Sequence, residues 1–310
     1  MVDELFFGRQ LLERVFASDG ILVSSELACL SDLSDKELEL FHKSWTETSV
    51  ERRHEVISQL VNLSEDNFGL DFTELFVDCL QDSDETVRIQ AISGLELCEN
   101  HLVINPLIRL LREDSSATVR ATVAIALARF AMLGELGKLP SEYADDVYLA
   151  LLEVLDGVTE PVDVKRRALE AIAPFSLPRV KELIKEFYDS GDVKFKVSAI
   201  YAIGRNCDIA WLPVLLDELN SDEAEVRYEA AGACGELQAD EAVPHLIKLI
   251  YDEDDMVQEA AIRALGAIGG YKAKQALNNL VNDSRLHIQQ TAKSAIDELE
   301  FWESPLSLEF

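Results

Sequence analysis

Four arginines and two tyrosines in the central and following part of the chain have side chains suited to binding. Arginine holds a carboxylate through two parallel hydrogen bonds, and Tyr and Arg are enriched among residues that dominate binding energy. We predict a partner-binding surface for an anionic or mixed peptide, formed by Arg129, Arg166, Arg167, Tyr201, Arg205 and Tyr228. The alternative is that these arginines pair with Glu170, Glu229 and Glu236 on adjacent helices, because exposed ion pairs are common.

Metal chemistry requires several ligands at matched spacing, and the sequence supplies few. His54-Glu55 places a histidine beside a carboxylate, as two-metal centres require, but one such pair supplies too few ligands to hold two metal ions. The acidic run at 252–255 lacks the alternating ligands and the glycine of a calcium-binding loop. We therefore predict no catalytic residue, no metal site and no cofactor.

A short phrase that recurs along the chain indicates how these residues are positioned. It consists of a hydrophobic residue, a basic residue or Gln, two variable residues, a small residue, and an apolar residue four positions later. One copy contains Val226, Arg227, Ala230 and Cys234. The second position of the phrase falls at 53, 88, 120, 165, 196, 227, 258 and 289, so the last four steps are each 31 residues. A regular period of this length predicts a solenoid of stacked units.

Each repeat has the pattern of two helices joined by a short acidic turn. In residues 209–238, apolar residues recur at helical spacing on both sides of Asn220-Ser221-Asp222. The side chain of Ser221 or Asp222 can cap the second helix. The alternation typical of strands is nearly absent, which predicts an all-α fold.

Several residues of the repeat resemble HEAT repeats. They are the prolines of the first helix (Pro213 and Pro244), the Asp-x-x-x-Val-Arg turn, and Ala-x-x-Ala-Leu-Gly at 261–266. The period is similar to that of the short HEAT-like repeats of the phycobilin-lyase group, over roughly residues 31–300. The resemblance implies a right-handed α-solenoid, an armadillo-like superhelix of about eight helical hairpins.

The resemblance also implies a structural ladder, in which the basic residue of each phrase bonds an Asp of a neighbouring turn. The ladder residues implied in this way are Arg53, Arg88, Arg120, Lys165, Lys196 and Arg227. Gln258 and Gln289 depart from the pattern. We expect the ladder to weaken toward the C-terminus, because Gln forms hydrogen bonds but no ion pair.

The repeats divide the chain into an N-terminal helical cap at 1–30, a solenoid at 31–300 and an apolar C-terminal tail at 301–310. The long step between 120 and 165 predicts an insertion near 132–146, where Gly134, Gly137 and Pro140 are loop signals. No stretch has the length and apolar character that we expect of a membrane span.

The chain is strongly acidic, with a formal net charge of −30 and an isoelectric point of about 4.4. This charge argues against a nucleic-acid partner and against an anionic membrane surface. Residues 101–200 contain nearly equal numbers of acidic and basic residues, so the excess of acidic residues lies toward both ends of the chain. It serves either to attract a basic protein partner or to maintain solubility. The five cysteines show no Cys-x-x-Cys motif, which favours reduced thiols in a cytoplasmic protein. The sequence leaves the oligomeric state open.

From these features we predict a non-catalytic protein-binding scaffold or adaptor that uses the concave face of the solenoid. The alternative implied by resemblance is a phycobilin-lyase-like protein that handles a tetrapyrrole or its carrier protein. His54-Glu55, directly after Arg53, is also similar to the HEAT-like deoxyhypusine hydroxylases, which use several His-Glu pairs for a di-iron centre. Because this chain has one such pair, we set that activity aside.

Overall fold

The computed structural model describes residues 10–17, 20–67 and 69–303, and no β-strand occurs within these ranges. The chain divides into unit 1, residues 1–168, and unit 2, residues 169–310. The helices that start in unit 1 are α2 (Ser24–Ala28), α3 (Asp35–Glu47), α4 (Val50–Asp66), α5 (Thr73–Cys79), α6 (Glu85–Gly94), η1 (His101–Val103), α7 (Ile104–Glu113), α8 (Ala117–Glu135), α9 (Ser141–Asp156) and α10 (Val162–Ile172). Those of unit 2 are α11 (Pro178–Tyr188), α12 (Val193–Asn206), η2 (Ile209–Trp211), α13 (Leu212–Glu218), α14 (Ala224–Glu236), η3 (Asp240–Ala242), α15 (Val243–Leu249), α16 (Asp255–Ile268), α17 (Gly270–Leu280) and α18 (Leu286–Glu303).

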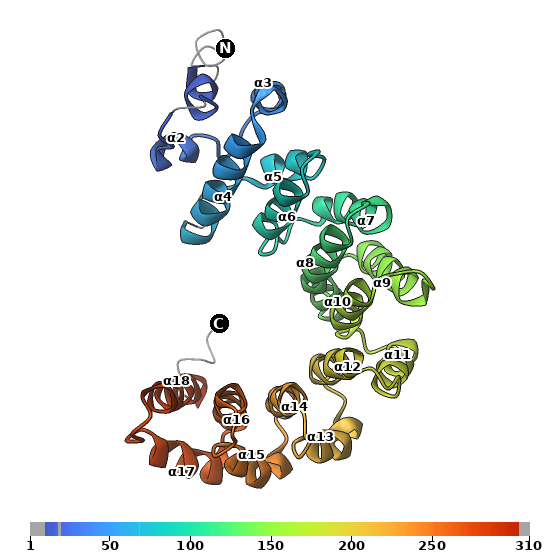
Figure 1. Cartoon of the computed structure of the whole chain (residues 1–310), viewed down its shortest axis with the longest axis vertical. Coiled ribbons are helices and arrows are strands. Elements are labelled where there is room, and N and C mark those ends of the chain that lie inside the picture. Colours follow the sequence, from blue (N-terminus) through green and yellow to red (C-terminus); the bar gives the residue numbers. More distant parts are fainter. Residues whose placement is uncertain (1–9, 18–19, 68, 304–310) are drawn as a thin grey trace. The chain divides into compact units, whose positions relative to one another are not determined.

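Within each unit the helices form two rows, which Figure 1 shows as successive hairpins. In unit 2 an inner row stacks α12 on α14, α14 on α16 and α16 on α18. The outer row contains α11, α13, α15 and α17, and each of these packs against the inner helix that follows it. Unit 1 repeats this arrangement, with α4, α6 and α8 in its inner row. The predicted all-α solenoid of helical hairpins is thereby confirmed.

The repeat phrase lies on the inner helices and supplies the core. Val226, Ala230 and Cys234 of α14 are fully buried, as are Val257 and Ala261 of α16. The acidic turns cap these helices. The side chains of Asp84, Asp192 and Asp254 accept hydrogen bonds from the first backbone N–H groups of α6, α12 and α16, where the helix dipole also favours negative charge.

Glycines allow the inner helices of unit 2 to approach closely. A Cβ atom on Gly204 would lie 2.9 Å from the Cα of Ala233, and one on Gly235 would lie 3.0 Å from the Cα of Ala264. A Cβ on Gly266 would meet the Cβ of Ala295 at 2.9 Å. These glycines recur at the period of the repeat, so the period specifies the close packing as well as the helices.

The extra residues between the third and fourth phrases, which we predicted as a loop insertion near 132–146, are largely helical in the structure. The extra residues lengthen two helices, because α8 ends at Glu135 and α9 begins at Ser141. Gly134 lies inside α8, and only residues 136–140 lie between the helices.

One helix in the described chain, α8, is long and apolar enough to cross a membrane, judged by length and composition alone. This differs from the expectation that no stretch has that character. Val119, Val123, Leu127 and Phe130 of α8 are buried inside unit 1, so its apolar composition also suits a core helix of the repeats.

The predicted cap and tail fall partly outside the described residues. Within residues 1–30 the structure describes helix at 10–15 and α2. At the other end α18 continues to Glu303, and residues 304–310 are outside the described range.

Candidate functional sites

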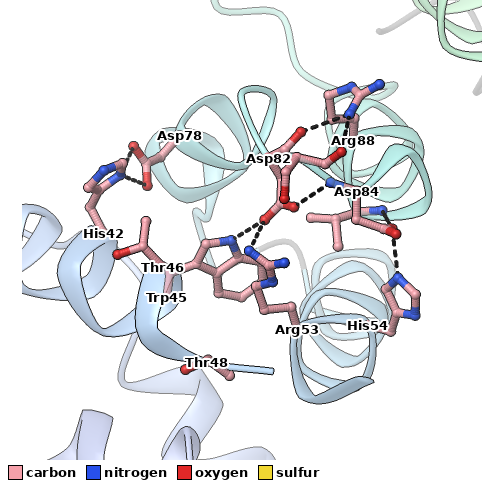
Figure 2. Close-up of polar contacts among 12 residues, drawn as sticks. His42, Trp45, Thr46, Thr48, Arg53, His54, Asp78, Asp82, Asp84 and Arg88 are labelled. Atoms are coloured by element: carbon pink, nitrogen blue, oxygen red, sulfur yellow. Dashed lines mark hydrogen bonds and ion pairs between the residues drawn. The ribbon is translucent and has the colours of Figure 1, made fainter. Parts of the chain in front are cut away.

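The first rung of the ladder centres on the carboxylate of Asp82 (Figure 2). The side chain of Asp82 is fully buried. It accepts hydrogen bonds from the indole Nε1 of Trp45 at 2.6 Å and from the backbone N–H of Asp84 at 2.8 Å, and it forms an ion pair with Arg53 at 3.1 Å. The backbone carbonyl of Asp82 accepts a further hydrogen bond from Arg88 at 2.8 Å. One turn residue therefore links two successive phrases.

Arg88 and Arg227 show the complete form of a rung. Arg88 donates to both carboxylate oxygens of Asp114, at 2.7 and 3.0 Å, and to a carbonyl six residues earlier in its own turn. Arg227 likewise donates to both oxygens of Asp252, each at 2.8 Å, and to the carbonyl of Ser221. Each guanidinium thus ties its own turn to the turn of the next repeat.

The other ladder residues vary this arrangement. Arg120 bonds the carbonyl of Asp114 at 2.7 Å, and its carboxylate partner is Glu160 at 3.1 Å. Lys165 donates to the carbonyl of Leu155 at 3.1 Å. Lys196 pairs with Glu218 at 2.6 Å, and its ammonium also lies over the ring of Tyr188. The lysines reach fewer turn groups than the arginines because an ammonium lacks the planar fork of a guanidinium.

At Gln258 the phrase residue of the ladder carries no positive charge, and the cation is supplied by a residue of the following turn. Its amide donates to the carbonyl of Asp252 at 2.5 Å, as an arginine would, and its side-chain oxygen accepts from Arg285 at 2.8 Å. Asp283, at the turn of the next repeat, is bound by Arg285 through two contacts of 3.0 Å. The hydrogen bond of Arg285 lowers the pKa of Asp283 to about 2. The cation of this rung therefore comes from the following turn.

His54 tests whether the di-iron centre implied by resemblance fits this chain. Its Nε2 lies 2.7 Å from Asp84 (Figure 2), and the hydrogen bond lowers the pKa of that carboxyl group. Glu55 instead pairs with Arg52 at 2.8 Å. Among the residues that the structure describes, no three His, Cys, Asp or Glu side chains are grouped where they could hold a metal ion. These residues do not fit a di-iron centre, and we derive no reaction step through one.

A groove of about 880 Å³ lies along the inner row of unit 2, and we call it the inner groove. It runs over α12, α14, α16 and α18. Its polar lining consists of Tyr201, Arg205, Tyr228, Glu229, Glu236, Gln238, Arg263 and Glu298, and its small residues include Gly204, Gly232, Ala233, Gly235, Ala264, Gly266 and Ala267.

The repeat explains how these residues meet. Tyr201, Gly232 and Arg263 each lie five residues after the second position of a phrase, so they form one line across adjacent helices. A Cβ atom on Gly232 would touch nothing within 4 Å. The middle of that line is therefore open, between a tyrosine on α12 and an arginine on α16.

The two arginines of the inner groove are already paired with carboxylates. Arg205 lies 3.3 Å from Glu236, and Arg263 lies 2.5 Å from Glu259. Burial raises the pKa of the Tyr201 hydroxyl; Arg205 opposes the rise, while Glu236 and two further carboxylates add to it. More carboxylates than cations thus act on this tyrosine.

The six residues predicted to bind a partner divide between the two units. The inner groove brings together Tyr201, Arg205 and Tyr228. Arg129, Arg166 and Arg167 belong to unit 1. There Arg129 pairs with Glu99 at 2.5 Å, and Arg166 lies 3.4 Å from Asp163. The pair between Arg205 and Glu236 agrees with the alternative interpretation of these arginines.

The predicted partner-binding set left out Gly232, Arg263 and Glu298, which line the inner groove. The predicted set consists of side chains with binding chemistry, whereas Gly232 contributes to the inner groove by having no side chain. A signal was present, because Gly232 and Arg263 stand at the same phrase position as Tyr201. Glu298 stands at the phrase position of Arg205, nine residues after the second position.

A family model for HEAT repeats matches residues 46–144 and 212–297, which is more than half of the chain. The chain therefore belongs to the HEAT-repeat family, as its stacked hairpins and phrase predicted.

The matching curated proteins share the name of one enzyme, deoxyhypusine hydroxylase. Deoxyhypusine hydroxylase of Candida albicans is 30% identical over 37% of this chain and 37% of its own length. The human enzyme is 30% identical over 30% of each chain. The chain thus spans about a third of the length of these two relatives. Deoxyhypusine hydroxylase of Eremothecium gossypii is 22% identical over 78% of this chain and 81% of its own length.

Among solved structures, the complex of CpcE and CpcF of phycocyanin lyase from Nostoc has a TM-score of 0.52 and 16% identity. The match covers 91% of this chain and 97% of that chain. At this level of identity the likeness concerns the fold alone, and it agrees with the predicted resemblance of the repeats.

These comparisons contradict the predicted function. We expected a non-catalytic scaffold or adaptor, or a phycobilin-lyase-like protein, whereas the curated relatives are enzymes named deoxyhypusine hydroxylase. The hydroxylase activity had been set aside because the sequence contains one His-Glu pair. Such a count describes which metal chemistry the residues can support, but it does not measure which sequences are related.

Proposed function

We propose that this protein recognises, as its substrate, a segment of a basic protein that carries deoxyhypusine or a similarly long cationic side chain. The binding site in this proposal is the inner groove of unit 2. The name of the curated relatives supplies the substrate class. The observation that carries the proposal is the lining of the inner groove, which combines tyrosines, carboxylates and an open floor of small residues.

Deoxyhypusine is a lysine side chain lengthened by an aminobutyl group. Its two amines are cationic at neutral pH, because aliphatic amines titrate near pH ~10. Such a ligand needs a narrow path for its methylene groups and acceptors for its ammonium groups. Gly232 and its small neighbours leave the path open, and Glu229, Glu236 and Glu298 supply carboxylates along it.

The tyrosines add a second means of holding a cation. An ammonium group over an aromatic face gains about 0.5–2 kcal/mol, more when water is excluded. Tyr201 and Tyr228 lie on adjacent helices of the inner groove, and the carboxylates around Tyr201 outnumber its one nearby arginine. The net charge of −30 also favours the approach of a basic protein.

The proposal includes a cytoplasmic location, where thiols such as those of the five free cysteines stay reduced. It concerns recognition of the substrate. No oxidation step is assigned to the described residues, because they bring together no metal-binding group.

The test uses two peptides that differ in one side chain, deoxyhypusine or lysine. Calorimetry with the full chain should show tighter binding of the deoxyhypusine peptide, because it has an additional amine and a longer chain. Gly232→Leu should weaken this binding by at least about tenfold, since its Cβ meets no atom within 4 Å and the new side chain occupies the open floor. Mass spectrometry of the recovered peptide would detect an added oxygen atom separately.

The matched control is Asn278→Leu, which adds the same side chain to an exposed position of α17 in the outer row. It should leave peptide binding unchanged. Equal affinity of the unmodified protein for both peptides, or equal losses in the two variants, would overturn the proposal.

A further inference from the structure

Three large apolar side chains are exposed in the turn before α16 and in the first turns of α16 and α18. Tyr251 is 72% exposed, Met256 55% and Leu286 65%. Tyr251 lies in the turn before α16, Met256 in the first turn of α16, and Leu286 begins α18. We call these three residues the turn-edge patch. None of them lines the inner groove.

The fold does not require apolar residues at these positions. One period earlier in the sequence, the residues equivalent to Tyr251, Met256 and Leu286 are Asn220, Glu225 and Asp255. Those repeats form the same helices with polar side chains there. The turn-edge patch is therefore a local feature of the last two repeats rather than part of the repeat pattern.

The reversed rung of the ladder joins the first turns of the two helices that carry Met256 and Leu286. Arg285 donates to Gln258 on α16 at 2.8 Å, which ties the start of α18 to the start of α16. Tyr251 and Asp255 both lie close enough to raise the pKa of Arg285, after the larger effect of its hydrogen bond to Asp283. His287, next to Leu286, lies 3.8 Å from Asp255.

Exposed carboxylates lie between Tyr251 and Met256 in the sequence. Glu253 and Asp255 have side chains that are 89% and 74% exposed. Arg227 is engaged by Asp252 and also lies 3.7 Å from Glu253, while Arg285 is engaged by Asp283 and Gln258.

We infer that the turn-edge patch docks a basic amphipathic helix of a protein partner. Tyr and Met are suited to anchoring an apolar helix face, because tyrosine is frequent among binding hot spots and methionine adapts its shape. The exposed carboxylates complement lysines and arginines beside that face. Charge complementarity thus selects a basic helix over a neutral one and over a second copy of this acidic chain.

The experiment uses three synthetic helical peptides of equal length. The first has leucines on one face and lysines on the other; the second has serines in place of the leucines; the third has glutamates in place of the lysines. Fluorescence anisotropy with the full chain should show tight binding of the Leu/Lys peptide. The Ser/Lys and Leu/Glu peptides should bind at least roughly tenfold more weakly, since each lacks one part of the match.

The decisive variant combines Tyr251→Asn, Met256→Glu and Leu286→Asp, which introduces the residues found one period earlier. It should bind the Leu/Lys peptide at least about tenfold more weakly, with unchanged helicity. Because two of the substitutions add negative charge, attraction of the lysines alone would strengthen binding instead. Amide hydrogen exchange should show peptide-induced protection at 250–257 and 284–289 in the unmodified protein.

Unchanged affinity of this variant, or protection confined to the inner groove, would overturn the inference. Sedimentation that shows a dimer of the unmodified chain and a monomer of the variant would also overturn it, in favour of self-association. Gly232→Leu, which blocks the inner groove, should leave binding of the Leu/Lys peptide intact. The two proposals can therefore fail independently.

Discussion

Arg227 on α14 holds both carboxylate oxygens of Asp252 at 2.8 Å, across the boundary between two repeats of unit 2. The exposed fraction of both side chains is below a tenth. Burial alone would raise the pKa of Asp252, but the hydrogen bonds from Arg227 and from the backbone of the turn lower it overall. Packing between these repeats is therefore coupled to one buried charge pair.

Replacing Arg227→Gln should destabilise unit 2 by about 3 kcal/mol, because Asp252 would keep a buried charge without its cation. Glutamine can still reach the turn carbonyl, as Gln258 does one repeat later. Urea unfolding followed by circular dichroism measures the loss. Lys185→Gln removes an exposed pair with Asp189 in the same unit and should change stability by less than about 0.5 kcal/mol. Equal effects of the two substitutions would show that burial of the rung has no energetic role.

The close approach of inner helices makes two glycines respond in opposite ways to the same change. Gly235→Ala should cost about 1–3 kcal/mol, because its methyl group would lie 3.0 Å from the Cα of Ala264. Gly232→Ala meets open space and should stabilise α14 by about 0.5–1 kcal/mol through higher helix propensity. Thermal unfolding of both variants tests the pair; a stabilising Gly235→Ala would mean that α14 and α16 are farther apart.

The reversed rung at Arg285 gives a pH prediction. Its hydrogen bonds lower the pKa of Asp283 to about 2, below the usual value of an aspartate. A carboxylate with a lowered folded-state pKa stabilises the fold above its unfolded pKa near ~4, and this contribution is lost as the pH falls toward 2. NMR titration of Asp283 should show the low value, and Arg285→Gln should return it toward the usual range. A titration unaffected by the substitution would assign the lowering to another group.

Reversing one charge in the inner groove should affect ligand binding more than reversing it elsewhere. Glu298→Lys should weaken binding of the deoxyhypusine peptide by roughly tenfold or more and reduce its dependence on salt. Glu241→Lys makes the same change of charge at an exposed residue of η3 and should have a smaller effect. If both variants weaken binding equally, the overall charge of the chain rather than the inner groove attracts the peptide.

The period of 31 residues was sufficient to predict the helical hairpins and the buried face of the inner helices, and the resemblance of particular repeat residues indicated the family. Helical spacing and close packing both depend on residues within one repeat or its neighbour, so a single sequence contains that information. The roles of Arg88 and Arg227 in the ladder could likewise be predicted, because each guanidinium bonds a turn one repeat away.

The tertiary structure was needed wherever the outcome depended on what surrounds a residue. Gly232 has no chemistry of its own, and its role follows from the tyrosine and arginine on the helices beside it. The extra residues between 132 and 146 could form a loop by composition, yet packing against neighbouring helices extends α8 and α9. Gln258 could only be predicted to weaken the ladder, whereas in the fold Arg285 supplies the missing cation from the following turn. Repeating local interactions are determined by the sequence of the repeat, while an open groove or a reversed rung depends on side chains that several helices bring together.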